Sequence, residues 1–209
     1  MKIISHRGYW EREAEKNSDK AFRRALSHGF GIETDLRDFG KKVVISHDSP
    51  DFSAMPFNDF LDLYQALSDG HEVLALNIKA DGLQERILTS LNEHDVSGYF
   101  FFDMSIPDAL EFQRKDMKFF TRQSELEQNP NLYESATGVW MDCFFDDWIR
   151  EDHIRAHLDA GKQVCVCSPE LHRRDPAAFW NRMMHMKLSQ DPRVMLCTDE
   201  PRKAQAFFN

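Results

Sequence analysis

Residues 31–48 read GIETDLRDFGKKVVISHD and contain two strand-like runs joined by a short turn. Glu33 and Asp35 lie two positions apart in the first run, and a strand directs such residues to the same side. The second run ends in His47 and Asp48. Two like charges side by side inside a barrel are costly unless a cation lies between them. The stretch therefore predicts a metal ion at the end of a strand, followed by a hairpin-like return.

Similar β-rich runs recur along the whole chain, with helical segments between them. Eight runs share this character: KIISHRG (2–8), GIETDLR (31–37), VLALNIK (73–79), YFFFDMS (99–105), KFFTRQS (118–124), GVWMDCF (138–144), QVCVCSP (163–169) and VMLCTDEP (194–201). They lack the alternating polarity of exposed sheets, which indicates a parallel sheet covered by helices. Eight units predict an α/β fold, a compact (β/α)₈ TIM barrel forming a single domain over residues 1–209, with a short insertion after the second strand. A doubly wound open sheet is the alternative, although the turn after the first strand offers only HRG in place of a glycine-rich loop.

Helix signals fill most of the connections. Four segments combine apolar spacing at helical period with capping or stop residues: 17–29, 81–95, 106–116 and 175–188. We expect the last of these to use Asp175 as its cap, with Pro176 in its first turn. The polar segment ELEQNPNLYESA (125–136) has an internal proline and predicts no good helix. Any lid or specificity element would have to come from the longest connection, residues 49–72, which is small.

Composition limits the classes of partner. The chain has 209 residues, a net charge of −9 and a pI near 5.5, which argues against nucleic acid or an anionic membrane surface as a partner. No stretch has the apolar length of a membrane span or of a signal peptide. Four cysteines without a C-x-x-C pair indicate reduced core thiols. A cytoplasmic location is therefore expected, and an anionic substrate would have to be attracted by a local group of cations or a metal.

Polar residues gather at the ends of the first predicted strands, where barrel enzymes build their active sites. They are His6, Arg7, Glu33, Asp35, His47, Asn77 and Lys79. Oxygen ligands favour a hard ion such as Mg²⁺ or Ca²⁺. Two plainer interpretations remain open: Glu33 and Asp35 as solvated loop carboxylates, or Arg7 and Lys79 as their structural ion-pair partners.

In HRG (6–8), NSDKAFRRALSHGFGIETDL (17–36), VVISHD (43–48), NIK (77–79) and CTDEP (197–201), the sequence resembles the glycerophosphodiester phosphodiesterases, within the wider group of phosphatidylinositol-specific phospholipase C-like barrels. The resemblance implies His6 and His47 as general acid and base, and Glu33 and Asp35 as ligands of the cation. It also implies that Arg7 and Lys79 neutralise the phosphate.

Two positions depart from the family pattern. Asn77 stands where a third acidic ligand is usual, which predicts a weaker metal site, and Lys16 replaces a glutamate just before Asn17. The segment after the HD motif also looks short for the family.

Several other residues remain open to interpretation. Asp103 and Asp142 end two strands and are interpreted as helix caps, with a supporting role at the site as the alternative. Four aromatic residues are candidates for lining a substrate pocket, although most aromatics are expected in the core: Trp10, Phe101, Trp140 and Trp148. Seven histidines show no partner at ligand spacing: His28, His71, His94, His153, His157, His172 and His185.

The sequence thus predicts a metal-dependent phosphoric diester hydrolase for glycerophosphodiesters or a similar small phosphodiester. A lyase that stops at a cyclic phosphate, and a non-catalytic barrel that binds a phosphodiester or phosphosugar, are the alternatives. Neither nucleic acid nor stable membrane insertion is expected, and the sequence does not predict an oligomeric state.

Overall fold

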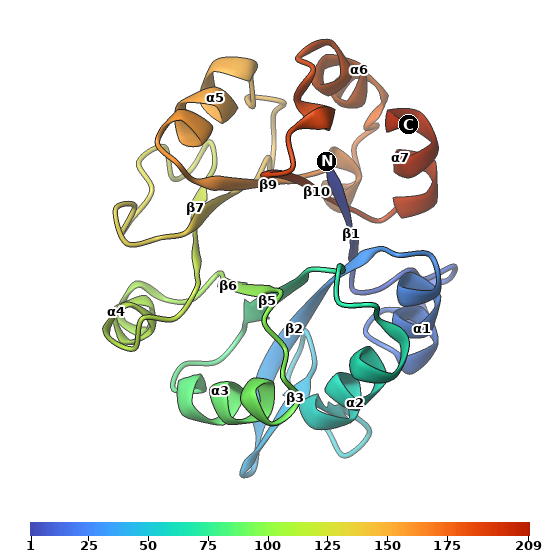
Figure 1. Ribbon diagram of the computed structural model, residues 1–209, viewed down its shortest axis with the longest axis vertical. Coiled ribbons are helices and arrows are strands. Elements are labelled where there is room, and N and C mark those ends of the chain that lie inside the picture. The colour runs from blue at the N-terminus through green and yellow to red at the C-terminus, as the bar shows by residue number, and fades with distance from the viewer.

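Eight parallel strands form a closed ring in the computed structural model, which describes residues 1–209 (Figure 1). Neighbouring strands pair in the order β1, β2, β5, β6 and, on the other side, β7, β8, β9, β10, with β10 pairing back to β1. A single parallel bridge between Phe101 and Phe119 joins β6 to β7, and the Phe101 N–H donates to the carbonyl oxygen of Lys118 at 3.0 Å. The ring consists of β1 (Lys2–His6), β2 (Gly31–Phe39), β5 (Leu74–Ile78), β6 (Tyr99–Phe102), β7 (Phe120–Gln123), β8 (Gly138–Met141), β9 (Gln163–Cys167) and β10 (Val194–Thr198). The predicted barrel is confirmed, and the open sheet is wrong.

Seven helices lie outside this ring (Figure 1). They are α1 (Asp19–Ser27), α2 (Phe57–Leu67), α3 (Gln84–Glu93), α4 (Ile106–Arg114), α5 (Glu151–Asp159), α6 (Ala177–His185) and α7 (Pro201–Phe208). Ser18 caps α1 by accepting from the Ala21 N–H at 3.3 Å. As expected, no helix forms between β7 and β8. The predicted start of α6 is wrong by about one residue, because Pro176 is the N-cap, while Asp175 Oδ1 accepts from the Ala177 N–H at 2.9 Å.

The connection 49–72 has two parts: Ser49, Asp51 and Ser53 line a hollow together with His47, and the rest packs as part of the barrel. β3 (Lys42–Ile45) returns antiparallel to the end of β2, β4 (Met55–Pro56) pairs with β3, and α2 follows at once. α2 packs against α1 through Phe60 and Phe22, whose ring centroids are 4.7 Å apart. Both phenylalanines are fully buried, so this segment closes the outer layer of the barrel.

Side chains fill the middle of the ring. Ten buried residues form this interior, and strands β1, β5, β6, β7, β8, β9 and β10 each supply at least one of them. Phe102 and Trp140 stack there with centroids 3.8 Å apart. Phe101 points to the outer core instead, under the helices. Trp140 and Phe101 are therefore core residues and do not line a pocket.

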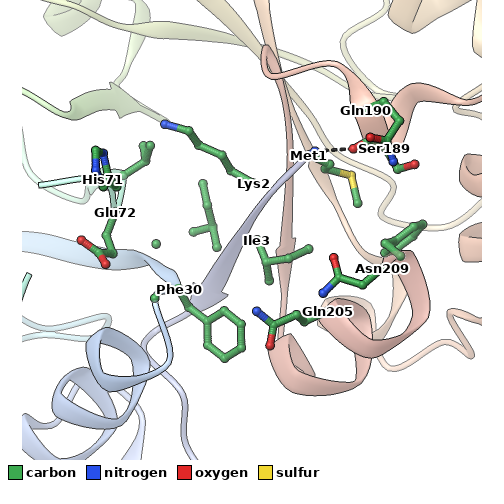
Figure 2. Close-up of a pocket in the computed structure, with 15 residues that line it drawn as sticks. Met1, Lys2, Ile3, Phe30, His71, Glu72, Ser189, Gln190, Gln205 and Asn209 are labelled. Atoms are coloured by element: carbon green, nitrogen blue, oxygen red, sulfur yellow. Dashed lines mark hydrogen bonds between the residues drawn. The ribbon is translucent and has the colours of Figure 1, made fainter. Parts of the chain in front are cut away.

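A hollow of about 420 Å³ lies at the N-terminal end of the strands (Figure 2). Met1 and the β1 residues Lys2 and Ile3 line it, together with Gln205 of α7 and the loop residue Glu72. The N-terminal amine donates to the carbonyl oxygen of Ser189 there (Figure 2). This end of a barrel normally serves stability, so the hollow is not the predicted site. None of the helices has the length and apolarity needed to cross a membrane.

Candidate active site

The HRG turn places the first polar residues at the C-terminal end of the barrel. Arg7 and Gly8 both have positive φ angles, +56° and +83°. A Cβ at Gly8 would lie 2.9 Å from the backbone carbon of Ala21 in α1, so only glycine fits between the strand end and the helix. The turn directs the Arg7 backbone N–H to Glu33 Oε2 at 3.1 Å. The motif therefore supplies a hydrogen-bond donor from the backbone as well as two side chains.

Glu33 and Asp35 are almost fully buried, with 2% and 1% of their surfaces exposed. Asp35 receives a hydrogen bond from Asn17 Nδ2 at 2.9 Å. Its Oδ2 lies 3.2 Å from Arg7 Nε, and its Oδ1 lies 3.5 Å from Lys79 Nζ. The interpretation as solvated loop carboxylates is therefore wrong. The other plain interpretation, that Arg7 and Lys79 are ion-pair partners of the carboxylates, is observed at Asp35, which both cations contact.

Glu33 has fewer partners than Asp35. His6 Nε2 is 3.9 Å from Glu33 Oε2, and the Arg7 N–H is its hydrogen-bond donor. Burial, and then the repulsion of Asp35, raises the pKa of Glu33 from its ordinary value of 4.5 to about 7. Without a further cation, part of the Glu33 population therefore carries a proton near neutral pH.

Asn77 lies directly opposite Asp35 in the parallel register of β5 and β2. Its Nδ2 donates to Asp103 Oδ2 at 3.3 Å, and Asp103 Oδ1 also accepts from Arg122 Nη1 at 3.1 Å. Asp103 does not cap a helix, because Ser105 caps α4. The helix-cap interpretation of Asp103 is wrong, and its carboxylate belongs to this end of the barrel.

His6 is oriented by a residue from the far end of the sequence. Its Nδ1 lies 2.7 Å from Asp199 Oδ1, at the end of β10, and 15% of the His6 side chain is exposed. A carboxylate accepts a hydrogen bond from Nδ1–H, which keeps the proton on Nδ1 and leaves the Nε2 lone pair available for proton transfer. The indole N–H of Trp10 donates to the His6 carbonyl oxygen at 3.1 Å and holds the turn from the other side.

His47 lies on the loop after β3 and is much more open, with 43% of its side chain exposed. Its Nδ1 is 2.9 Å from Asp48 Oδ1, and its carbonyl oxygen accepts from Arg37 Nε at 3.1 Å. His6 and His47 line two different hollows, of about 640 and 470 Å³. Arg7 and Lys16 line both hollows and so stand between the two histidines.

Buried oxygen atoms at this end of the barrel could hold a divalent cation. No three His, Cys, Asp or Glu side chains gather as a metal site anywhere in the protein. However, Asp35 Oδ1 and Asn77 Oδ1 are both buried without a hydrogen-bond partner, on adjacent strands in direct register. With Glu33 beside them, they form an oxygen donor set of the kind that Mg²⁺ and Ca²⁺ prefer. The residues therefore fit a hard cation, with an amide as the third ligand.

Two long-range contacts at this end of the barrel could not be found from the sequence. His172 Nε2 lies 2.6 Å from Asp142 Oδ1, across 30 residues, so His172 does have an acidic partner and Asp142 is not a helix cap. Of the four aromatic candidates, Trp10 lines a hollow at this end, whereas Trp148 is partly buried against the outer core and donates to the Asp142 carbonyl oxygen at 2.7 Å. Arg122 likewise had no signal in the sequence, since only closure of the barrel brings β7 beside β6.

The chain was compared with known proteins. No family model and no curated protein sequence matches it. Solved structures do: a glycerophosphodiester phosphodiesterase from Parabacteroides distasonis aligns with a TM-score of 0.74 and 18% identity, over 99% of this chain and 96% of that one. A putative glycerophosphodiester phosphodiesterase from Galdieria sulphuraria gives a TM-score of 0.79 at 17% identity, over 99% and 97%.

A Ca²⁺-dependent phosphatidylinositol-specific phospholipase C from Streptomyces antibioticus aligns with a TM-score of 0.58 and 12% identity, over 100% of this chain and 96% of that one. At these identities the alignments establish the fold, which the sequence resemblance had implied. The chain has the (β/α)₈ barrel fold of the glycerophosphodiester phosphodiesterases and of this phospholipase C.

Proposed function

We propose that the protein is a metal-dependent phosphoric diester hydrolase that acts on glycerophosphodiesters or a similar small phosphodiester. One observation carries the proposal. His6, oriented by Asp199, has its Nε2 3.9 Å from Glu33 of the buried Glu33–Asp35 pair, in a barrel with the glycerophosphodiester phosphodiesterase fold. The four buried free thiols support the reducing, cytoplasmic location expected from the sequence.

The residues divide into three tasks. Arg7 and Lys79 supply positive charge where an anionic phosphodiester would bind. His6 moves a proton at Nε2, and His47 provides the second proton-transfer group from the neighbouring hollow. Glu33, Asp35 and Asn77 would hold the cation, Mg²⁺ or Ca²⁺, which when bound supplies Lewis-acid stabilisation of charge on the phosphoryl oxygens.

A non-catalytic phosphodiester-binding barrel is the second candidate. It is favoured by Asn77, which removes a negative charge from the donor set, and by the ion pairs that already occupy Asp35. A binding protein of this kind would need the cations and the hollows but not His6 as a base.

Turnover decides between the two candidates. Protein stripped with EDTA should be assayed on a panel of glycerophosphodiesters with Mg²⁺, Ca²⁺ or Mn²⁺ added back. We expect hydrolysis that depends on the ion, and its loss in the Glu33→Gln, Asp35→Asn double variant. Binding without turnover under every condition would support the binding barrel instead. Phosphorus NMR identifies the product. A phosphomonoester indicates a hydrolase, and a cyclic phosphate indicates a lyase.

A further inference from the structure

We propose that the hollow beside His6 recognises a second phosphate on the alcohol part of the substrate. This inference rests on the proposed function and deepens it. It assigns a role to three cations that the mechanism does not use: Lys16, Arg173 and Arg202. They come from different parts of the chain, after β1, after β9 and in the first turn of α7, and they line one hollow of about 640 Å³.

The charge balance of the hollow leaves these cations without partners. Five Lys or Arg and five Asp or Glu residues line it. Arg7 pairs with Asp35, and Lys203 pairs with Glu200, whereas Lys16, Arg173 and Arg202 have no carboxylate within ion-pair distance.

The acids of the hollow are mostly engaged already. Glu11 pairs with Arg24, Asp199 with His6 and Glu200 with Lys203, while Glu170 accepts from the Ser168 and Thr198 hydroxyls. Glu13 has no partner, and Asp199 and Glu170 are held by a histidine and by hydroxyls, so three unpaired cations share the hollow with three carboxylates that no Lys or Arg neutralises. Lys16, Arg173 and Arg202 are thus free to contact a phosphomonoester, which carries roughly −1.5 to −2 at neutral pH and offers three acceptor oxygens to cations from three directions.

Lys16 also limits which substrate alcohols the hollow can bind. Its Nζ lies 4.4 Å from the centroid of the Trp10 ring, so the lysine already covers the aromatic face in this hollow. An open indole face would attract a quaternary ammonium group. With that face occupied by a cation, a choline headgroup meets repulsion instead. The hollow should therefore select against cationic alcohols and in favour of phosphorylated ones.

Calorimetry on a matched ligand pair tests the inference independently of turnover. Glycerophosphoinositol and glycerophosphoinositol 4-phosphate differ by one phosphomonoester, and EDTA in the buffer keeps divalent ions out of the comparison. We expect the phosphorylated ligand to bind at least about tenfold more tightly, as is usual for new charge-assisted hydrogen bonds. Equal affinities, or no detectable binding of the phosphorylated ligand, would overturn the inference.

Variants locate the effect within the hollow. Lys16→Gln and Arg202→Gln should each reduce the preference for the phosphorylated ligand by about fivefold, in line with loss of one charge-assisted contact. Arg202 is exposed on α7, so its variant does not depend on the packing around Lys16. Lys115→Gln is the matched control, because Lys115 pairs with Glu85 on the outside of the barrel. If the control changes the preference as much as the other two variants, the hollow is not the cause.

Hydrolysis rates keep the two proposals apart. Metal-dependent turnover of both ligands without a preference would leave the proposed function intact and reject the second-phosphate site. Tight, Lys16-dependent binding of the phosphorylated ligand without turnover would support the site and reject the hydrolase.

Discussion

Asp35 and Asn77 face each other across β2 and β5, and neither buried Oδ1 atom has a hydrogen-bond partner, although the Lys79 ammonium lies 3.5 Å from that of Asp35. Unpaired buried oxygens are rare because each costs the free energy of its lost hydration. A cation between the two strands would satisfy both. The relationship explains how an amide can occupy a position where the family resemblance implies a carboxylate.

Asn77→Asp should strengthen metal binding in the absence of substrate by about tenfold, because it restores a charged ligand without lengthening the side chain. The variant should also be less stable than the parent in EDTA, since Asn77 Nδ2 now donates to Asp103 and a second carboxylate would be repelled there. Calorimetry with Ca²⁺ and Mg²⁺ measures the affinity. An unchanged or weaker affinity would place the third ligand elsewhere, with Asp103 as the next residue to test.

Stability should fall as the pH rises from 4.5 to 7 in EDTA. The pKa of Glu33 is raised to about 7 in the folded protein, so folding favours its protonated form. The resulting stabilisation is complete below pH 4.5, the ordinary pKa of the group, and is lost as the pH rises through 7. At about 1.4 kcal/mol for each pKa unit, the loss from this group is about 3 kcal/mol.

Glu33→Gln is the matched control for this prediction, because its amide stays neutral. Urea unfolding at pH 4.5 and pH 8 should show the extra loss in the parent and not in the variant. Ca²⁺ or Mg²⁺ should restore the stability of the parent at pH 8, as any ligand of the folded state does. If the stability of the parent and of the variant depends on pH in the same way, Glu33 ionises in the folded protein at little cost in free energy.

The His6–Asp199 pair should matter more for the rate than for binding. His6→Ala should reduce kcat by about a hundredfold or more, because it removes the proton-transfer group. Asp199→Asn should cost about tenfold or more, because an amide no longer fixes the Nδ1–H form of the ring. The double variant should be no slower than His6→Ala alone. Additive losses would mean that Asp199 acts independently of His6.

His47 provides a contrast, because its carboxylate neighbour is solvated. His47→Ala should also cost about a hundredfold in kcat and remove one limb of a bell-shaped pH profile. Asp48 is 93% exposed, so the His47–Asp48 contact is weak, and Asp48→Asn should change kcat by less than about threefold. A His47→Ala variant with near-parental turnover would remove this histidine from the mechanism.

The two tryptophans Trp140 and Trp10 should respond differently to truncation. Trp140 is 3% exposed and stacks on Phe102 inside the ring, so Trp140→Ala should cost about 3–5 kcal/mol of stability. Trp10 lines the hollow beside His6, so Trp10→Ala should raise KM with a smaller loss of stability. Thermal unfolding and steady-state kinetics of both variants check the assignment. A stable Trp140→Ala protein with a raised KM would show that Trp140 lines the substrate pocket after all.

The sequence by itself determined the local features of this protein. Strand period places Glu33 and Asp35 on one side of β2, Ser18 caps α1, and the polar segment 125–136 forms no helix, because each depends on neighbouring residues in the chain. The number of strands followed from the same local patterns and predicted the barrel correctly.

Only the tertiary structure decided which strand ends meet. His6 is 193 residues from Asp199 in sequence, and the two touch because β1 and β10 close the ring. The Asp142–His172 and Arg122–Asp103 contacts depend on strand neighbours in the same way. The spacing of residues in the sequence does not predict such contacts, because they arise from the register between strands far apart in the chain. For the same reason only the tertiary structure decided how segment 49–72 divides: residues near its start line the hollow beside His47, and α2 joins the helical layer by packing on α1.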